Sequence, residues 1–493
     1  MGMMFSPPSA LVWHRTDFRL SDNAAVTAAA ASAGGAVAGV VVLPTDLHAV
    51  ASEAGPPRAS ATAGTGQRRA DRARAFGVPP GVTRSSPRRV GHLLQALDGL
   101  RAEWEAAGSA LFVLQGPAHE CLPALAESLG VREVHTAPCL AVDERAENAV
   151  VAHALAAGDV PLVVHDETTL IAFADLPFTL EALPDVFSTY RRQVERACAV
   201  RDPLPVPVLG RVPDDVRARA RAEADAVLAA PVFQAAWRAA ADHDPRASFV
   251  PDGRRAAGLE RLRQWIWQTD SLARYKDTRD GLMGRDVSSR LSLWLATGAL
   301  SPREVAAEVR RYEHERVANE STYWLVFELL WRDFFHCWVR RWQGRAFRAT
   351  GVLGRTPCGR QDAGVFARWC AGETGEPLVD AGMRELQATG QLSNRARQNV
   401  ASWLARTAGI DWRWGAAWFE QHLLDYDVGP NWGNWQYVAG VGNDPRNRIF
   451  NVRAQAERYD PEGAYRARWL GAASPAAGDL TSGTPAISST IRP

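Results

Sequence analysis

The spacing of apolar residues changes part-way along this 493-residue chain. Up to about residue 166, short β-branched runs alternate with alanine-rich amphipathic stretches, whereas beyond residue 254 apolar residues recur every three or four positions. The first pattern predicts strands and helices in turn, and therefore a doubly wound parallel sheet covered by helices on both faces. An irregular α+β layer is the alternative. The second pattern predicts an all-helical unit.

The alternating part predicts individual elements. Apolar runs predict buried strands at 10–14, 36–43, 110–114, 133–136 and 162–165. The stretches between them predict helices near 23–31, 90–106, 117–129 and 143–157. No GxGxxG glycine motif follows the first strand, so we expect no dinucleotide in this unit.

Composition divides the chain into five segments. We expect an N-terminal tail (1–9), an α/β domain (10–168), an inter-domain connector (169–254), a helical domain (255–470) and a disordered tail (471–493). The connector is rich in proline and carries one helical piece near 214–229, a composition typical of linkers. The last segment is poor in large apolar residues, so it cannot bury enough surface to fold alone.

Amino-acid composition limits the possible binding partners of the protein and its possible cellular compartment. The 56 basic and 55 acidic residues leave a net charge of +1, so any nucleic-acid surface must be a local basic patch. Six cysteines without CxxC or zinc spacing suit a reducing compartment. No apolar run approaches the ~20 residues that cross a bilayer, which predicts a cytoplasmic protein. Residues 1–6 fit an N-myristoylation pattern, but so short a match often arises by chance.

Glu328, Trp331 and Arg332 place an indole beside a charged pair in the helical half. Residues three and four apart share one face of a helix, so Glu328 is expected beside both others. Such a face suits a flat, hydrogen-bonding ligand. The alternative is that aromatic residues at helical spacing form the core, which is the more common arrangement.

Two further polar clusters interrupt the apolar pattern. Three serines within 288–292 precede a helical run and can present hydroxyls and backbone N–H groups to a phosphate, although a helix cap has the same composition. The second cluster, 393–399 with 425–435, is dense in amides, arginines and carboxylates. Such groups must be paired or bind a ligand, and a network of Arg397 with Asp425 is compatible with both.

Three stretches make the chain recognisable. They are 374–386 followed by Asn394-Arg395-Ala396-Arg397, Trp331-Arg332-Asp333-Phe334, and 11–23. In this order they resemble the motifs of photolyases and cryptochromes, and the resemblance spans about 11–470. Ser393, Gln398 and Tyr437 depart from ordinary dimer photolyases and look like the cryptochrome DASH branch. A serine in place of histidine at 393 argues against a (6-4) photolyase, whose proton transfer needs that histidine.

The resemblance implies FAD bound in a U shape within the helical domain. The matching positions imply phosphate contacts from Tyr275, Ser288, Ser289, Arg290, Leu291 and Ser292. They imply contacts to the flavin and ribityl chain from Asn394, Arg397, Asp425, Asp427 and Asn431. Asn431 is expected to face flavin N5, where a neutral amide tunes the cofactor without adding charge.

The same resemblance implies light-driven repair of cyclobutane pyrimidine dimers, in which excited reduced FAD sends an electron into the dimer and recovers it. Glu328 is expected to hydrogen-bond the flipped-out dimer, with Trp331 and Tyr437 stacked against it. The other expected DNA contacts are Arg279, Arg332, Arg395, Gln398 and Arg448. Tyr437 offers less stacking surface than tryptophan, so single-stranded DNA or looped-out lesions are the expected substrates.

Two accessory functions follow from matching positions. Trp435, Trp412 and Trp369 match the family's electron-transfer chain, which reduces the flavin from the protein surface. Glu144 matches a residue that holds an antenna pterin, methenyltetrahydrofolate, between the domains; an ordinary surface helix is the alternative. We expect the protein to act as a monomer.

Two other functions remain open on the sequence. A blue-light photoreceptor needs the same FAD and the same tryptophan chain, so the site residues do not separate it from a repair lyase. The tail of 471–493 is shorter than a typical signalling extension, which favours repair. A flavin redox protein without a DNA role leaves Glu328, Trp331 and the arginines unexplained.

Overall fold

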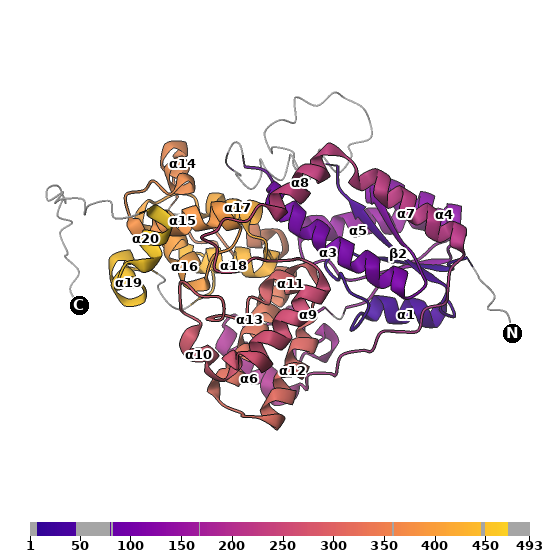
Figure 1. Ribbon diagram of the computed structural model, residues 1–493, viewed down its shortest axis with the longest axis horizontal. Coiled ribbons are helices and arrows are strands. Elements are labelled where there is room, and N and C mark those ends of the chain that lie inside the picture. Colours follow the sequence, from indigo (N-terminus) through magenta and orange to yellow (C-terminus); the bar gives the residue numbers. More distant parts are fainter. Residues whose placement is uncertain are drawn as a thin grey trace.

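The computed structural model describes residues 7–45, 79, 82–166, 168–356, 359–444 and 449–471. The pattern at residues 1–6, the expected tail beyond 471 and the expected DNA contact Arg448 lie outside the described residues. Figure 1 shows a part that contains the sheet and a helical part, which lie side by side.

In its described residues, the first domain contains one five-stranded parallel sheet. Its strands are β1 (Ala10–Trp13), β2 (Val37–Leu43), β3 (Leu111–Gln115), β4 (Glu133–Thr136) and β5 (Leu162–Val164). Their order is β3-β2-β1-β4-β5, and every neighbouring pair is parallel. The five predicted strands and the doubly wound sheet are confirmed, and the irregular α+β layer is wrong.

Helices cover both faces of this sheet (Figure 1). They are α1 (Ala24–Ser32), α3 (Pro87–Ala106), α4 (Ala118–Leu129) and α5 (Val142–Ala156), close to the predicted ranges. α1 and α3 share a core with Ala10 and Val12, whereas α4 and α5 share a core with Leu11 and Trp13. Successive residues of β1 thus enter opposite cores, as expected for a strand buried on both faces.

The segment 169–254 contains more structure than a linker. Its helices are α6 (Phe187–Ala197), α7 (Asp214–Leu228) and α8 (Pro231–Ala241), with a 3-10 turn η1 (Phe173–Asp175). The sequence predicted α7 but not α6 or α8. α7 packs on β3, α8 on α3, and α6 on α13 (Glu320–Trp342) of the helical domain. Gly91 allows the contact of α3 with α8, because a Cβ there would lie 2.1 Å from the Ala236 carbonyl oxygen.

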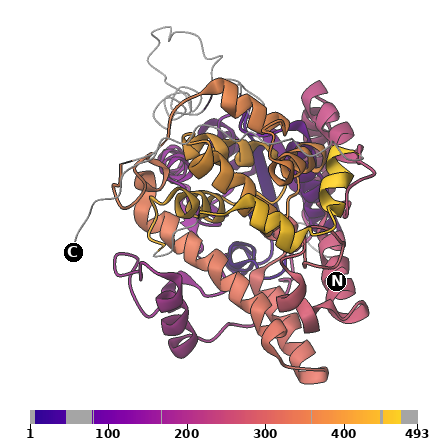
Figure 2. The ribbon, with the colours of Figure 1, turned by 90° about the vertical axis from the view of Figure 1, so that its left-hand side faces the viewer.

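The second domain is helical, as predicted. Its α-helices are α9 (Arg255–Arg263), α10 (Tyr275–Thr278), α11 (Ser292–Thr297), α12 (Pro302–Glu315), α13 (Glu320–Trp342), α14 (Ala363–Ala371), α15 (Pro377–Thr389), α16 (Asn394–Ser402), α17 (Trp412–His422), α18 (Val428–Ala439), α19 (Val452–Tyr459) and α20 (Ala464–Leu470). Shorter turns are η2 (Gln264–Gln268), η3 (Ser271–Arg274), η4 (Gln343–Phe347) and η5 (Trp403–Thr407). Among its described residues, extended pairing is limited to one bridge between Arg360 and Ile410. Figure 2 shows α13 as the long diagonal helix.

Asp22 joins the first domain, the connector and the helical domain. Its carboxylate accepts from Arg303, with N–O distances of 2.7 and 3.0 Å, and from the Ser301 hydroxyl at the start of α12. It also accepts from the backbone N–H of Leu204 at 3.0 Å. Asp22 and Arg303 are both fully buried, so each charge depends on the other for compensation.

We expect Asp22→Asn to lower the free energy of unfolding by about 3 kcal/mol, because the new amide N–H₂ faces donors and Arg303 loses its counter-charge. Asparagine tolerates the left-handed conformation of this position, which has a φ of 47°. Chemical denaturation measures the change. The control Asp98→Asn breaks an exposed pair with Arg254 and should cost less than about 1 kcal/mol. Equal losses in both variants would contradict the role of Asp22.

Candidate functional site

A cavity of about 720 Å³ opens in the helical domain. Its walls come from α6, the loop before α11, α13, α16, the end of α17, and α18. Most predicted site residues line it: Tyr275, Arg279, Ser288, Ser289, Arg290, Leu291, Ser292, Glu328, Trp331, Arg332, Asn394, Arg397, Gln398, Asp425, Asp427, Asn431, Trp435 and Tyr437. Arg395, Trp369, Trp412 and Glu144 lie elsewhere. Residues more than 150 positions apart in the sequence thus meet in one place.

Arg261 fixes the conformation of the serine-rich loop. Its guanidinium donates to the backbone carbonyls of Ser288 and Ser289, both at 2.9 Å, and of Arg285 at 3.0 Å. It also pairs with Asp286 at 2.7 Å. Because Arg261 hydrogen-bonds the loop's carbonyl groups, these oxygens are not left to repel an anion at the wall that Ser288 and Ser289 line. Arg261 was not among the predicted site residues, because nothing in the sequence separates it from the many other arginines.

Arg290 adds a partly buried cation to the same wall. Its backbone is left-handed, with a φ of 61°, and its Nε atom is buried without a hydrogen-bond partner. Burial lowers the pKa of this guanidinium, partly offset by Glu385. An unpaired buried donor of this kind is costly unless a ligand completes it. The loop and Arg290 therefore fit a phosphate-bearing ligand.

The predicted network of Arg397 with Asp425 is present. Nη2 of Arg397 lies 2.9 Å from both carboxylate oxygens of Asp425. Nε of Arg397 donates to the Leu392 carbonyl at 2.9 Å, so the side chain is held at both ends. The two charges compensate each other at the cavity wall.

Asp427 lies at the cavity wall, where its neighbours keep it ionised as a carboxylate. Its oxygens lie 2.7 and 3.0 Å from His336 Nε2, and Arg332 Nε lies 3.3 Å from Oδ2. Burial alone would raise the pKa of Asp427, but His336 and Arg332 more than offset this and hold it at about 2. Asp427 also caps α18 by accepting from the Gly429 N–H. The same carboxylate therefore binds His336 and Arg332 and caps the N-terminus of α18.

Asn431 presents a fixed amide to the cavity. Its Nδ2 donates to the backbone carbonyl of Ala416 at 3.1 Å, which orients the side chain. The oxygen Oδ1 is then available as an acceptor. A ligand N–H opposite Asn431 would meet a neutral acceptor.

Glu328 lies between two neighbours that orient it. Arg279 pairs with Oε1, and Trp324 Nε1 donates to the same oxygen at 3.0 Å. Burial raises the pKa of Glu328, while Arg279 and Trp324 act in the opposite direction. Its side chain is still 31% exposed, so one oxygen is free to meet a ligand. Trp324 was missed, although its position four residues before Glu328 on one helix face could have suggested it.

Aromatic rings form the wall beside Glu328. Phe187 of α6 stacks on Trp331 with ring centroids 3.6 Å apart, and Tyr437 lies 6.4 Å from Trp331. Phe335 completes the group, 5.5 Å from both Trp331 and Tyr437. One face of Trp331 is therefore already covered. Phe187 was missed, because the composition of its segment indicated a linker.

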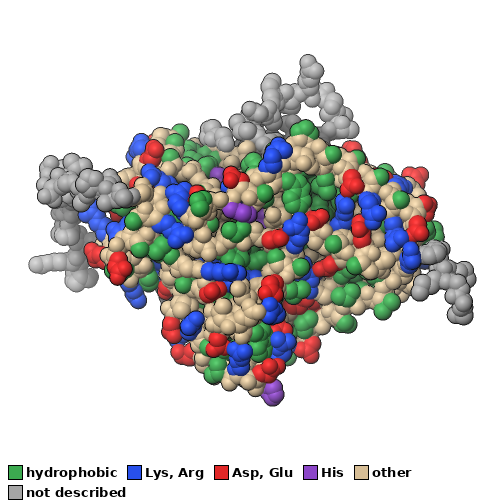
Figure 3. All heavy atoms as spheres, in the orientation of Figure 1, with side chains coloured by type: hydrophobic (Ala, Val, Ile, Leu, Met, Phe, Trp, Pro, Cys, Tyr) green, Lys and Arg blue, Asp and Glu red, His purple; other side chains and the backbone are tan. Residues whose placement is uncertain are grey.

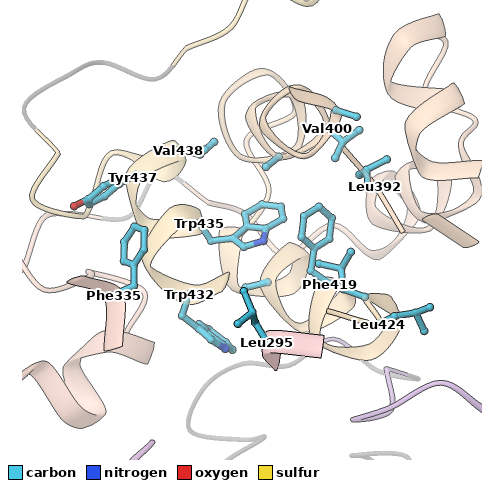
Figure 4. Packing of buried hydrophobic residues seen from close by; sticks show 14 of the residues in the cluster. Leu295, Phe335, Leu392, Val400, Phe419, Leu424, Trp432, Trp435, Tyr437 and Val438 are labelled. Carbon is cyan, nitrogen blue, oxygen red and sulfur yellow. The ribbon is translucent and has the colours of Figure 1, made fainter. Parts of the chain in front are cut away.

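The three tryptophans of the expected electron chain are buried in the helical core. Trp435 lines the cavity and lies 6.3 Å from Trp369, while Trp412 lies 5.7 Å from Trp432. Figure 4 shows Trp435 beside Phe419, with Tyr437 on another side of α18. Trp435 and Trp369 are thus direct neighbours, whereas the indole next to Trp412 is Trp432.

Two predicted DNA contacts, Arg332 and Arg395, have partners within the protein. Arg332 donates to the carbonyls of Thr168 and Leu295, both at 3.3 Å, in addition to Asp427. Arg395 pairs with Asp280 at 2.9 Å and lies over the ring of Tyr459. Both guanidinium groups are thus committed within the protein, and their predicted DNA contacts remain predictions.

Glu144 lies at the start of α5, outside the cavity. Its carboxylate accepts from the Ala141 N–H at 3.3 Å, which is the contact expected of a helix cap. Its neighbour Asp143 lies 3.8 Å from Arg84, and Arg84 lies 3.5 Å from Glu420 of α17. Glu144 thus stands where the first domain approaches the helical domain.

Two family profiles match the sequence. One described as DNA photolyase matches residues 10–208, and one described as FAD binding domain of DNA photolyase matches residues 324–481. A cryptochrome DASH of Natronomonas pharaonis is 42% identical over 462 residues, which cover 94% of this chain and 90% of that protein. The chain belongs to the photolyase and cryptochrome family. A second cryptochrome DASH, from Gloeobacter violaceus, is 40% identical with coverages of 94% and 86%, which places the chain in the cryptochrome DASH branch.

Solved structures agree with this assignment. The crystal structure of a Synechocystis cryptochrome superposes with a TM-score of 0.79 at 35% identity, over 95% of this chain and 89% of that one. A class III photolyase of Agrobacterium tumefaciens shares the fold, with a TM-score of 0.73 at 24% identity over 95% and 87% of the two chains. The protein is therefore a light-driven flavoprotein of the cryptochrome DASH branch, with an FAD-binding helical domain.

The cavity fits FAD on its own chemistry. The donor-rich serine loop and the incompletely paired Arg290 suit the two phosphates. The neutral amide of Asn431 and the paired charges of Arg397 and Asp425 suit an uncharged ring system. FAD supplies the redox and light-absorbing chemistry, and these residues supply its binding and orientation.

Among the described helices, none has the length and apolar character needed to cross a membrane.

We expect Arg261→Met to reduce the FAD content of the purified protein and to lower the free energy of unfolding by about 3 kcal/mol, because Asp286 loses its buried partner and the serine loop loses its anchor. The ratio of flavin to protein absorbance measures the first effect. The control Arg263→Met, in the same helix, removes an exposed pair with Glu260 and should change neither quantity. Full FAD occupancy in Arg261→Met would contradict the anchoring role.

Proposed function

We propose that this cryptochrome DASH repairs cyclobutane pyrimidine dimers in single-stranded or looped DNA, using one electron from light-excited reduced FAD. The observation that carries the proposal is that Glu328, Trp331 and Tyr437 line the same cavity as the residues assigned to FAD. A dimer against this wall would be close to the cofactor. The electron would return from the split pyrimidines, so no net oxidation or reduction occurs.

The proposal assigns FAD contacts to eleven residues. Those expected at the phosphates are Tyr275, Ser288, Ser289, Arg290, Leu291 and Ser292, and those expected at the flavin and ribityl chain are Asn394, Arg397, Asp425, Asp427 and Asn431. The acceptor oxygen of Asn431 would take a hydrogen bond from N5–H of the reduced ring. Trp435, Trp412 and Trp369 would supply the electrons that bring oxidised FAD to its reduced form.

The proposed DNA contacts form a local set. Arg279 stands beside Glu328, and Gln398 lines the cavity and accepts from Arg395 at 2.9 Å. On the face drawn in Figure 3, basic and acidic side chains are interspersed, in keeping with the net charge of +1. Weak long-range attraction to a duplex is expected from such a surface, so contacts at the cavity must supply the affinity.

The preference for unpaired DNA follows from the free energy of base flipping. Extruding a base from a duplex costs a few kcal/mol, which stacking inside the pocket must offset. Here one face of Trp331 is already covered by Phe187, and Tyr437 supplies a smaller ring than tryptophan. Less stacking is available to compensate for unpairing. A lesion in single-stranded DNA avoids most of that cost.

A blue-light photoreceptor is the second candidate function. It would need FAD and the tryptophan chain, but it would not need Glu328, Trp331 and Tyr437 to bind a lesion. The pairing of Glu328 with Arg279 and Trp324 at an open cavity gives the repair function a specific use for these residues. We therefore favour repair. The proposal also includes a cytoplasmic, monomeric protein, as expected from the sequence.

We expect Glu328→Gln to slow repair about tenfold, equivalent to about 1.4 kcal/mol of lost transition-state stabilisation, with FAD retained. Illumination of chemically reduced protein with dimer-containing single-stranded and duplex oligonucleotides, followed by recovery of thymine absorbance, measures the rate. The control Glu320→Gln alters an exposed residue of the same helix and should repair normally. No recovery with either wild-type substrate would reject the repair function.

Methenyltetrahydrofolate is the proposed antenna, with Glu144 holding it between the domains. We expect Glu144→Gln to weaken pterin binding while preserving stability, because glutamine caps a helix as glutamate does but lacks the charge. The near-ultraviolet absorbance of fresh protein measures pterin content. The control Glu127→Gln, an exposed residue of α4, should keep the pterin. Equal pterin in all three proteins would contradict the role of Glu144.

A further inference from the structure

The surface end of the electron chain is not among the matched tryptophans. Trp435, Trp412 and Trp369 have exposed fractions of 2%, 3% and 0%. A chain of indoles that draws electrons from solution must end at a ring that a solute can approach, because electron tunnelling falls off steeply with distance. Another residue must therefore provide the outer end.

A row of aromatic rings leads outward from Trp435. The centroid of Trp369 lies 6.3 Å from that of Trp435, and Phe366 of α14 stacks on Trp369 at 5.8 Å with an interplanar angle of 26°. Phe366 also lies 5.2 Å from Trp414 and 6.2 Å from Trp418. Trp414 is buried at 4% exposure, whereas Trp418 is partly exposed. Trp418 is therefore the first indole in this row that solvent reaches.

We propose that Trp418 is the solvent-facing end of the light-driven electron chain, linked to Trp435 through Trp369 and Phe366. This inference rests on the proposed tryptophan chain: it keeps Trp435 and Trp369 and adds Trp418, along a row of rings that does not pass through Trp412. Phenylalanine is much harder to oxidise than tryptophan, so Phe366 bridges the two indoles without itself losing an electron. The ring of Phe419 lies beside the first two indoles of the row, with its centroid 5.1 Å from that of Trp435 and 6.4 Å from that of Trp369 (Figure 4).

Each electron that reaches the flavin is replaced by one from the next residue outward. One electron passes from Trp435 to light-excited oxidised FAD. Trp369 gives one electron to oxidised Trp435, and Trp418 then gives one to oxidised Trp369. A thiolate in solution returns one electron to Trp418 and becomes a thiyl radical, and two thiyl radicals combine into a disulfide. The net change is reduction of FAD at the expense of an external thiol.

The surroundings of Trp418 suit a ring that is transiently positive. His422, one turn later on α17, has its ring centroid 4.2 Å from that of Trp418. Burial lowers the pKa of His422 to about 4, so its imidazole is neutral near pH 7. A neutral ring does not repel the positive charge left on an oxidised indole, whereas a protonated one would.

The test uses full-length protein loaded with oxidised FAD and an added thiol. The loss of oxidised-flavin absorbance under blue light gives the photoreduction rate, and transient absorption follows the indole radical. We expect Trp418→Phe to lose most of the photoreduction and the long-lived indole radical, with FAD content and melting temperature unchanged. The matched control Trp403→Phe changes a partly exposed indole that has no ring contact with another described residue, and it should behave as wild type.

A second measurement needs no substitution. Wild-type protein illuminated in air without thiol should accumulate oxidised tryptophan on the peptide that contains Trp418, as peptide mass spectrometry shows. Trp435→Phe separates the two proposals. Normal photoreduction in Trp435→Phe would reject the whole chain. If Trp435→Phe blocks photoreduction while Trp418→Phe does not, or if oxidation maps to Trp412, the chain stands and the assignment of Trp418 is overturned.

Discussion

Buried guanidinium groups determine how this protein is held together. Arg19, Arg255, Arg261 and Arg303 are each at most 8% exposed, and a buried charge is tolerated only when partners satisfy it. Arg303 draws Asp22 and Ser301 together at the domain junction. Arg255 does the same with Glu304 at 2.7 Å and Glu103 at 3.2 Å. Because a guanidinium binds its partners in fixed directions, these pairs set the relation of the two domains.

The same constraint shapes the chemistry of the cavity. Three carboxylates at its wall have a cationic partner: Asp425 with Arg397, Asp427 with Arg332, and Glu328 with Arg279. Arg261 occupies the carbonyls of the serine loop. Backbone donors and the incompletely paired Arg290 are left facing the ligand. The cavity therefore offers donors to an anionic ligand, while the charges of these three carboxylates are compensated.

The sequence predicted the elements better than their contacts. The five strands were predictable because a strand buried on both faces requires a continuous apolar run, and the serine loop because polar residues interrupt an apolar pattern. Arg261 and Phe187 were not predictable. One is an arginine among many, and the other lies in a segment whose prolines indicated a linker, although α6 brings Phe187 onto Trp331. Which partner a buried group finds depends on tertiary distances, and a single sequence does not contain them.

The burial of the tryptophans is another property that spacing does not reveal. Resemblance assigned three indoles to one chain, but only packing shows that Trp369 is enclosed and that α14 and α17 continue the row to Trp418. Helix α18 carries residues of both proposed functions, electron supply and lesion binding, on different faces. Asn431 and Trp435 are four residues apart and share one face, whereas Tyr437, two residues further, contacts Trp331 and Phe335 on another. In the proposed function, electrons would enter from one side of this helix and the lesion would bind on the other, so one rigid element would set both distances to the flavin.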